Sequence, residues 1–349
     1  ITRGMGNGLK QTPAGSGGLQ FGGGWTVVIV AQVAATVMFP ALVYVQQAFL
    51  RGVRDFDPGF AAGQYLAMQI ERDDPVDGTT SGAATVARNA RLAATLEELR
   101  RRVAEQPGVT GVTFAEVLPS TNHPQKAIEM GFDLGVDNSN ADLPLRVATI
   151  AAVHPSYFEV LDAPILAGRG FTAADAVPGS RVAIVDHSFI EQVLQGRNAV
   201  GEQVRFRYPA PSLRSWGAGN LDDPAGAGDW YEVIGVVREL GVDAPSQDGR
   251  GAGFYIPATP DVFNQIHMLV HVRGGDPMTL APQVREAAMA VDPSLRLVRV
   301  QRVSEANKDR LAMMRLLLRL TWVVSAVALV LSLAGIFGNS LDRYLVPDD

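Results

Sequence analysis

The chain has no cysteine among its 349 residues. Disulfide bonds, a thiolate nucleophile and cysteine-ligated zinc are therefore excluded. The sequence also lacks a G-x-x-x-x-G-K-[ST] segment, the pattern whose backbone N–H groups cradle nucleotide phosphates, so the chain has no P-loop of its own. If ATP drives this protein, a partner must hydrolyse it.

Charged side chains are scarce, at 19% of the residues, and acids outnumber bases, which gives a net charge of −6 at pH 7. The excess of acids lies in the middle of the chain, because residues 51–315 carry about −7 and the flanks together about +1. A surface of that sign repels polyanions, so neither nucleic acid nor an anionic lipid surface is expected to bind the central domain. With 47% hydrophobic residues, the chain is too apolar for a disordered protein.

Patterns of catalytic or metal-binding type are weak. His267 and His271 are four residues apart, as in a zinc-binding helix, but the glutamate of H-E-x-x-H is missing and their valine-rich setting is typical of a strand. Asp186, His187 and Ser188 supply the residue types of a catalytic triad, but neighbours in a strand point apart. We therefore expect no enzyme activity, no metal and no cofactor.

Two long apolar stretches contain no charged residue. The first covers residues 25–45 and the second residues 320–341. A helix rises about 1.5 Å per residue, so about 20 apolar residues cross the roughly 30 Å of bilayer hydrocarbon. Because lipid satisfies no backbone N–H or C=O group, both stretches are predicted to be transmembrane helices. The glycine-rich residues 1–24 are interpreted as a flexible cytoplasmic linker, and residues 342–349 as a tail.

Charges that flank these stretches do not fix the orientation. The first 24 residues carry two bases and no acid, which favours a cytoplasmic N-terminus. Against this, Arg51 and Arg54 follow the first stretch, and Arg315 and Arg319 precede the second. Large domains translocate largely regardless of charge, so the charges alone leave the side of the membrane open.

Apolar periodicity predicts α+β structure in residues 51–303. Residues 63–71 have strand character, and residues 109–118 form another strand after a Gln-Pro-Gly stop. Between them, residues 83–105 place apolar side chains at the three- and four-residue spacings of an amphipathic helix. The predicted apolar stripe comprises Val86, Leu92, Leu96, Leu99 and Val103.

A second strand–helix–strand pattern follows over residues 267–303. Two such βαβ-like units, at 63–118 and 265–303, predict a porter-like sheet assembled from both ends of the domain. Between them, residues 119–264 are rich in short strands and turns, and residues 209–229 have no periodicity, which is typical of a long loop. The expected fold is thus an α+β domain of mixed sheets, with a strand-rich insertion, anchored by two transmembrane α-helices.

Several segments of this domain resemble one protein family. Residues 153–189, VHPSYFEVLDAPILAGRGFTAADAVPGSRVAIVDHSF, are similar to the pattern V.p.YF.vLg.pll.GR.F...D......vavv of the MacB-like periplasmic core domain. The family often has glycine where this chain has Asp162. Further segments continue the resemblance in the family's order: NAVGEQVRF (198–206), YEVIGVV (231–237), FYIP (254–257) and LVLSLAGIFG (329–338).

The resemblance extends to the FtsX-like permeases, and most closely to the orphan duplicated permeases of ABC type. It implies an extracytoplasmic domain in the bacterial cytoplasmic (inner) membrane, between the first and second helices of a four-helix repeat. It also implies that motion passes from a cytoplasmic ATPase on another chain to this domain, and that the chain pairs with a second copy or a second permease repeat. The family continues into a basic segment and two more helices, whereas SLDRYLVPDD follows here, as in a truncated second repeat.

Residues 304–319 lead into the second apolar stretch without proline or glycine. Ala306, Leu311, Met314 and Leu318 recur there near helical spacing. We expect a stalk helix that transmits a rigid-body tilt from the membrane to the domain. The alternative is a plain juxtamembrane helix whose arginines extend to the lipid headgroups.

Small residues gather on one side of the second apolar stretch. Ser332, Gly335 and Gly338 recur every three residues, and Ala328 lies near the same face. Small residues let helices approach closely in lipid, where packing drives association. This face is predicted to pack against the first span or a second copy of the chain.

The rival function is a membrane-anchored extracytoplasmic ligand sensor. Two helices around an outer domain are also the layout of receptor kinases and chemoreceptors, and both classes use mixed sheets, so fold class does not separate them. Further hydrophobic helices after the second span would favour the permease, and a cytoplasmic signalling helix would favour the sensor.

Overall fold

The computed structural model describes residues 58–72, 82–133, 146–206, 228–240, 251–259 and 265–345, together with residues 30, 34, 38, 40–48, 50 and 51. The chain divides into two compact units. Residues 48–314 form the domain, and residues 1–47 with 315–349 form the helical unit.

Among the residues that the structure describes, the domain holds eleven strands joined in one sheet. In chain order these are β1 (Tyr65–Arg72), β2 (Val109–Ala115), β3 (Gln125–Met130), β4 (Arg146–Val153), β5 (Ile165–Gly168), β6 (Val182–Asp186), β7 (Gln203–Phe206), β8 (Trp230–Val237), β9 (Gly253–Pro257), β10 (Ile266–Val272) and β11 (Leu295–Arg302). The helices are η1 (Ala62–Gln64), α2 (Gly82–Ala104), η2 (Gly131–Asp133), α3 (Tyr157–Val160), η3 (Ala173–Asp175), α4 (His187–Gln192), η4 (Pro277–Leu280), α5 (Ala281–Val291), η5 (Val303–Glu305) and α6 (Lys308–Leu345).

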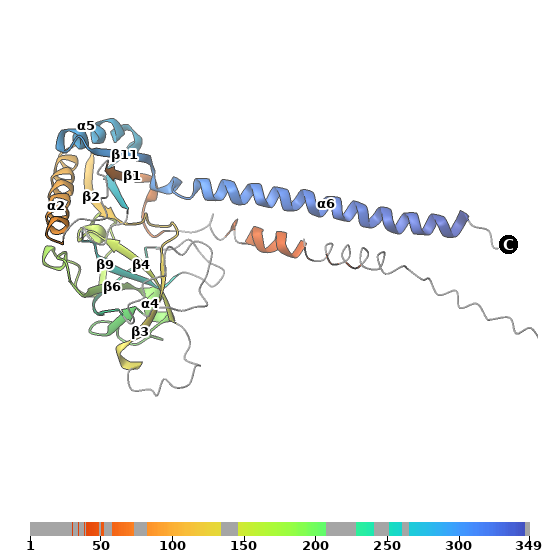
Figure 1. Ribbon diagram of the computed structural model, residues 1–349, viewed down its shortest axis with the longest axis horizontal. Helices are drawn as coiled ribbons and strands as arrows, with labels where there is room; N and C mark the ends of the chain where they lie inside the picture. The colour runs from red at the N-terminus through yellow and green to blue at the C-terminus, as the bar shows by residue number, and fades with distance from the viewer. Residues whose placement is uncertain are drawn as a thin grey trace, which may run out of the picture. The chain divides into compact units, whose positions relative to one another are not determined.

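The two predicted strand–helix–strand units form one part of the domain, the sheet-and-helix lobe. Its strands lie in the order β11-β1-β10-β2, and each neighbouring pair is antiparallel. The prediction that both ends of the domain build one sheet is confirmed. However, the two strands of each unit are not neighbours, because a strand of the other unit lies between them, as in a split βαβ arrangement. Helices α2 and α5 contact each other and pack on this sheet (Figure 1).

Helix α2 buries most of its predicted stripe. Leu92, Leu96, Leu99 and Val103 are buried against the sheet. Val86 is 69% exposed, so its assignment to the stripe was wrong. The reason is angular: it precedes Leu92 by six residues, which places it about 120° away around the helix axis.

Residues between β2 and β10 form the barrel lobe. Within the described residues, β4, β3, β7, β8, β6 and β9 pair in that order, and β9 returns to pair with β4, so the ring of strands closes. The pairs β4–β9 and β6–β8 are parallel and the other ring pairs are antiparallel, so the sheet is mixed as predicted. Closure removes the unpaired edges that an open sheet would expose.

Strand β4 of the barrel lobe is buried on both faces. In β4, Ala148, Ile150 and Ala152 belong to the barrel core, whereas Ala151 and Val153 belong to a second core on the opposite face. Strands covered on both sides have continuous apolar runs instead of alternation, which explains the sequence ATIAAV in β4.

The second core joins the two lobes, and we call it the seam core. It contains residues from β1, β2 and β10 of the sheet-and-helix lobe and from β4, β6, β8 and β9 of the barrel lobe. Its buried members are Tyr65, Ala67, Ala115, Leu118, Ala151, Val153, Tyr157, Phe158, Leu161, Ala163, Phe171, Ile184, Ile234, Val237, Leu240, Tyr255, Leu269 and Val303.

The VHPSYF segment covers the free edge of β2. That strand pairs with β4 only between Ala115 and Val153. Beyond this point the His154 backbone N–H donates to the Phe114 carbonyl at 2.9 Å, and the Ser156 hydroxyl donates to the Val112 carbonyl at 3.4 Å. Covering an edge with a loop and a helix is a common protection of strand edges.

The GRGF segment forms a tight backbone contact with β8. Gly168 has φ 72°, and a Cβ atom there would lie 2.2 Å from the Ile234 carbonyl oxygen. At Gly235, a Cβ atom would lie 2.2 Å from the Arg169 carbonyl oxygen. Only glycine fits both positions without a backbone shift.

Arg169 and Asp175 then close this loop with a bidentate ion pair. The guanidinium donates to the two carboxylate oxygens at 2.7 and 3.0 Å. The backbone N–H and the hydroxyl of Thr172 donate to the same carboxylate. These contacts lower the pKa of Asp175, first through Arg169, so the carboxylate stays ionised.

Helix α6 contains a segment fit to cross a membrane. By length and composition, Leu311–Val330 is the one such segment within the described part of the chain. It begins nine residues before the predicted span 320–341. The first predicted span, 25–45, lies largely outside the described residues; Val30, Ala34, Met38 and residues 40–45 of it are helical. Two transmembrane helices therefore stay a prediction.

Candidate functional site at the two membrane connections

The two chain segments that link the domain to the apolar stretches lie together. We call residues 58–61 the N-terminal connection and residues 303–307 the C-terminal connection. The first leads into η1 and the second contains η5, and these two short helices contact each other. Phe60 and Ala62 on one side, and Ala306 on the other, pack against the seam core. Any displacement of either connection therefore reaches the core that joins the lobes.

Gly59 holds the N-terminal connection against the barrel lobe. Its φ is 79°, and a Cβ atom there would lie 2.9 Å from the Glu239 carbonyl oxygen. The Arg238 guanidinium donates to the Gly59 carbonyl at 2.5 Å and to the Asp162 carbonyl at 3.3 Å. Arg238 follows β8, and Asp162 lies between α3 and β5, so both partners belong to the barrel lobe.

Tyr65 ties the start of β1 to α3. Its ring packs edge-on against Phe60, with centroids 5.3 Å apart, and stacks on His271 at 4.4 Å. Its hydroxyl donates to the Val160 carbonyl at 2.9 Å. Burial, and then the Asp162 carboxylate, raise the pKa of Tyr65 to about 12, so the hydroxyl keeps its proton and remains a donor.

The C-terminal connection is fixed by Val303 and Asn307. Val303 is buried in the seam core. The Asn307 carbonyl accepts the first α6 hydrogen bond, from Leu311 N at 2.9 Å, so Asn307 is the N-cap of α6. Its side-chain amide donates to the Ser120 carbonyl. The helix thus begins at Lys308, and Ala306, predicted as part of a stalk helix from residue 304, lies in the turn before it.

Ser120 belongs to a loop, residues 116–124, that links the two lobes. The Glu116 N–H donates to the Ala152 carbonyl and the Pro124 carbonyl accepts from Ile150 N, both at 2.9 Å, so each end is bound to β4. The Glu116 carbonyl also meets the His267 ring at 2.8 Å. The loop is therefore attached to β4, to β10 and, through Asn307, to the start of α6.

His123 of this loop is uncharged. It is 6% exposed, and its Nδ1 lies 3.0 Å from the Thr121 carbonyl. Because a carbonyl oxygen only accepts, Nδ1 carries the proton. Burial lowers the pKa of His123 to about 4.

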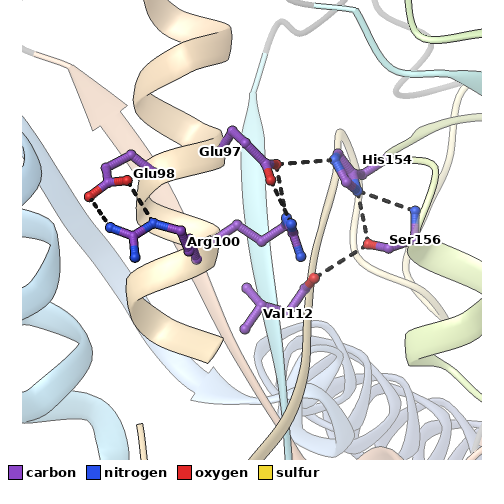
Figure 2. A network of polar contacts seen from close by, with 7 residues as sticks. Glu97, Glu98, Arg100, Val112, His154 and Ser156 are labelled. Carbon is purple, nitrogen blue, oxygen red and sulfur yellow. Dashed lines mark hydrogen bonds and ion pairs between the residues drawn. The ribbon is translucent and has the colours of Figure 1, made fainter. Parts of the chain in front are cut away.

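A polar network crosses the seam on the side of α2 (Figure 2). Nδ1 of His154 lies 2.8 Å from the Ser156 hydroxyl and 3.2 Å from the Ser156 backbone nitrogen, and Nε2 lies 4.0 Å from a Glu97 carboxylate oxygen. Glu97 in turn accepts two hydrogen bonds from Arg100. Burial, and then the Arg100 charge, lower the pKa of His154 to about 4. This network connects α2 with the segment that covers β2.

The predicted stalk residues on α6 lie on its less exposed side. Leu311, Met314 and Leu318 are half-buried, whereas Met313 is 58% and Leu316 50% exposed. All three also lie inside the apolar segment Leu311–Val330. Of the predicted helix-packing residues, Ala328 is half-buried; Ser332, Gly335 and Gly338 lie in α6, but their side chains are outside the described residues.

The weak catalytic patterns have structural explanations. His267 and His271 lie on β10, not on a helix, and contact Glu116 and Gln64 respectively. Asp186 is the N-cap of α4 and accepts from Phe189 N at 2.8 Å. The Ser188 hydroxyl donates to Glu239 at 2.5 Å. Over the described ranges, no group of three or more acidic or histidine side chains is placed to hold a metal ion.

Comparison with known proteins identifies the domain. Residues 41–290 match the family described as the MacB-like periplasmic core domain. The chain belongs to this family. A MacB-like domain is the extracytoplasmic part of an ABC-type permease, so the protein is membrane-anchored with an extracytoplasmic domain. This resolves the orientation that the flanking charges left open.

Two solved structures are similar to the chain. The periplasmic region of MacB from Actinobacillus actinomycetemcomitans is 13% identical, with a TM-score of 0.39, over 74% of this chain and 96% of that one. The extracellular domain of the noncanonic ABC-type transporter YknZ from Gram-positive bacteria is 14% identical, with a TM-score of 0.33, over 67% of this chain and 100% of that one. No curated protein matches. The assignment rests on the family match.

Arg238, Asn307 and Gly59 were not singled out from the sequence. Each contacts residues at least 76 positions away, so no local spacing marks them. Asp162 did carry a signal, since it departs from the family's glycine. Its φ is 52°, the left-handed region in which glycine is favoured.

Proposed function

We propose that this chain is a permease subunit of an ABC-type transporter that transmits ATP-driven motion to its periplasmic domain, for export or envelope remodelling. One observation carries this proposal: both membrane connections contact each other and pack on the core shared by the two lobes. A domain arranged in this way responds to a relative movement of its two anchors. In this proposal the ATPase is a cytoplasmic subunit supplied by another chain, and these 349 residues contain no P-loop.

The C-terminal connection is suited to transmitting a tilt. Strand β11 ends at Arg302, η5 follows at once, and two residues separate η5 from α6. Helix α6 then continues without proline to Leu345. Since a helix resists bending and the linking turn is anchored in the seam core, a tilt of α6 acts on β11 and on that core. In this proposal α6 acts as a lever, and Leu311, Met314 and Leu318 form its stalk face.

The proposal includes partners within the membrane. The face with Ala328, Ser332, Gly335 and Gly338 would pack against the first span, a second copy or a second permease repeat, and the rest of the apolar segment would contact lipid. Replacing Gly335 with leucine would block close approach there. Cross-linking between the spans that is unchanged in this variant would show that the face contacts lipid instead.

The sensor alternative predicts a different response. A sensor would change its domain on binding a small ligand, whereas the permease would change it when a cytoplasmic ATPase binds and hydrolyses nucleotide. The presence or absence of a nucleotide-dependent change in the domain, in the full-length protein with its ATPase, separates these functions.

A proline at Met313 tests the lever. Proline removes a helical hydrogen bond and clashes with the preceding turn, at a cost of about 3 kcal/mol or more. In the assembled transporter we expect Met313→Pro to preserve ATP hydrolysis and to abolish the nucleotide-dependent change of the domain, measured as a distance between paired spin labels. Met313→Leu, which keeps the helix, should behave like the native chain. A full response that survives an inserted Gly-Gly-Pro at this site would contradict the mechanism.

A further inference from the structure

The two membrane connections are covalently part of the sheet-and-helix lobe, because they flank β1 and β11. The barrel lobe, in contrast, has no such covalent link. Two hydrogen bonds nevertheless tie the connections to the barrel lobe and its linking loop: Arg238 donates to the Gly59 carbonyl, and Asn307 donates to the Ser120 carbonyl. These contacts are placed to make the barrel lobe follow the connections.

Two acceptors of these donors share an unusual conformation. Ser120 has φ 64° and Asp162 has φ 52°. An L-residue in this left-handed region costs about 1 kcal/mol or more and persists where the surroundings hold it. Asn307 donates to the first carbonyl and Arg238 to the second. Ser120 thus binds the C-terminal connection directly, and Asp162 shares the Arg238 guanidinium that holds the N-terminal connection at Gly59.

The chemistry of the donors fits a fastening role. The Arg238 guanidinium is always charged and presents several N–H groups, so it bridges the carbonyls of Gly59 and Asp162 at once. Asn307 accepts the first α6 hydrogen bond through its backbone carbonyl, and its amide N–H₂ donates to Ser120. Neither Arg238 nor Asn307 is a member of the seam core.

We propose that Arg238 and Asn307 are positioning residues that fasten the two membrane connections to the barrel lobe and its linking loop. With both hydrogen bonds formed, the barrel lobe follows the membrane segments together with the sheet-and-helix lobe. With them broken, the movement reaches the barrel lobe only indirectly, through the seam core and the junction of β2 with β4. The use of this fastening in transport rests on the proposed function, but the fastening itself does not.

Conservative substitutions isolate the two donors. Asn307→Asp keeps an N-cap oxygen for α6 and removes the amide donor. Arg238→Gln removes the charge and the bridging geometry. Arg181→Gln is the matched control, because Arg181 is an exposed arginine of the barrel lobe that pairs with Asp229 and not with a connection.

The measurement uses the full chain in lipid nanodiscs with pairs of spin labels, which the absence of native cysteine makes specific. A label at Lys308 marks the start of α6, a label at Glu191 marks the barrel lobe, and a label at Met289 marks α5. All three positions are exposed. For Arg238, a label at Ala61 replaces the one at Lys308.

We expect Asn307→Asp to broaden the distance distribution between 308 and 191 and to leave that between 308 and 289 narrow. Arg238→Gln should likewise broaden the distribution between 61 and 191, and Arg181→Gln should change none of them. Unchanged widths in both variants would overturn the proposal, as would equal broadening toward both lobes. If the labels respond as expected but Met313→Pro leaves the transporter coupled, the fastening stands and the transport mechanism fails.

Discussion

The sheet-and-helix lobe and the barrel lobe protect their strands in different ways. The first covers one sheet face with α2 and α5 and leaves β11 at an edge of the sheet as far as it is described. That edge carries a bulge next to Arg299, which has φ 51°, and bulges of this kind discourage pairing with another chain. The barrel lobe closes its ring of strands instead. The first lobe depends on helix packing, and the second depends on strand pairing and close backbone contacts.

The seam core joins the two lobes into one folding unit. It contains residues from both lobes, and both connections pack against it. We therefore expect the lobes to lose structure together, although their own cores are separate. The predictions below test this expectation, from the largest effect to the smallest.

The largest effect comes from emptying the two separate cores. Leu99 of α2 and Phe254 of β9 are both 0% exposed. Replacing either with alanine should lower the free energy of unfolding by about 3–5 kcal/mol, because transfer and cavity terms add. Denaturant unfolding, followed by circular dichroism and by a fluorescent label in each lobe, should show one transition in both variants. Two separate transitions would show that the seam core does not couple the unfolding of the two lobes.

Acid should destabilise the domain through two histidines at the junction of the lobes. His123 and His154 have pKa values lowered to about 4 from the ordinary 6.5. The fold thus favours the neutral rings, and the unfolded chain takes up protons first. Their contribution is complete above about pH 6.5 and is lost as the pH falls toward 4, by up to about 3 kcal/mol per residue. The double variant His123→Gln, His154→Gln should show a flatter dependence of stability on pH between these values. An unchanged slope would mean that these two histidines do not cause the acid sensitivity.

Ion pairs should matter in the barrel lobe and hardly at all on α2. Asp175 is 8% exposed and accepts from Arg169 and Thr172, so Asp175→Ala should cost about 2–3 kcal/mol. Since its pKa is lowered in the fold, this stabilisation is present above about pH 4 and lost below it. Glu98 on α2 also pairs with arginines, but its side chain is 36% exposed against 10% for Asp175, so Glu98→Ala should change thermal unfolding much less. Equal losses in the two variants would remove this distinction between the lobes.

The smallest expected effect is an increase in stability on replacing Asp162. Asp162 adopts a left-handed conformation that glycine adopts without a steric penalty. Asp162→Gly should raise the free energy of unfolding by about 0.5–1 kcal/mol, since relief of strain exceeds the added chain entropy. Gly59→Ala, at φ 79° and close to the Glu239 carbonyl, should act in the opposite sense. A destabilising Asp162→Gly would show that the carboxylate beside Tyr65 contributes more than the strain costs.

The sequence predicted local structure well and long-range pairing poorly. Helix α2 and strands β1 and β2 were found near their true bounds, because apolar periodicity or a stop signal marks them. Strands β3 and β5 and the short helices α3 and α4 were missed, since segments of four to six residues carry little periodic signal. The interleaving of β1 with β10 and the closure of β4 on β9 join residues about 100 or more positions apart, which local patterns do not record.

The same limit applies to the candidate site. The YF and GR motifs were recognised because they are contiguous, and the structure shows that they cover β2 and approach β8. The contacts of the two connections could not be predicted from the sequence, because Arg238 and Asn307 donate to distant backbone carbonyls, which any residue could supply.

Side-specific labelling tests the central claim, an extracytoplasmic domain held between membrane anchors, most directly. Single cysteines at Met289, which is 59% exposed on α5, and at Lys10 would be the only thiols in the chain. In intact cells with a permeabilised outer envelope, a membrane-impermeant maleimide should label the cysteine at 289 and should reach the one at 10 only after lysis. Labelling of position 10 but not of position 289 in intact cells would place the domain in the cytoplasm and contradict the account.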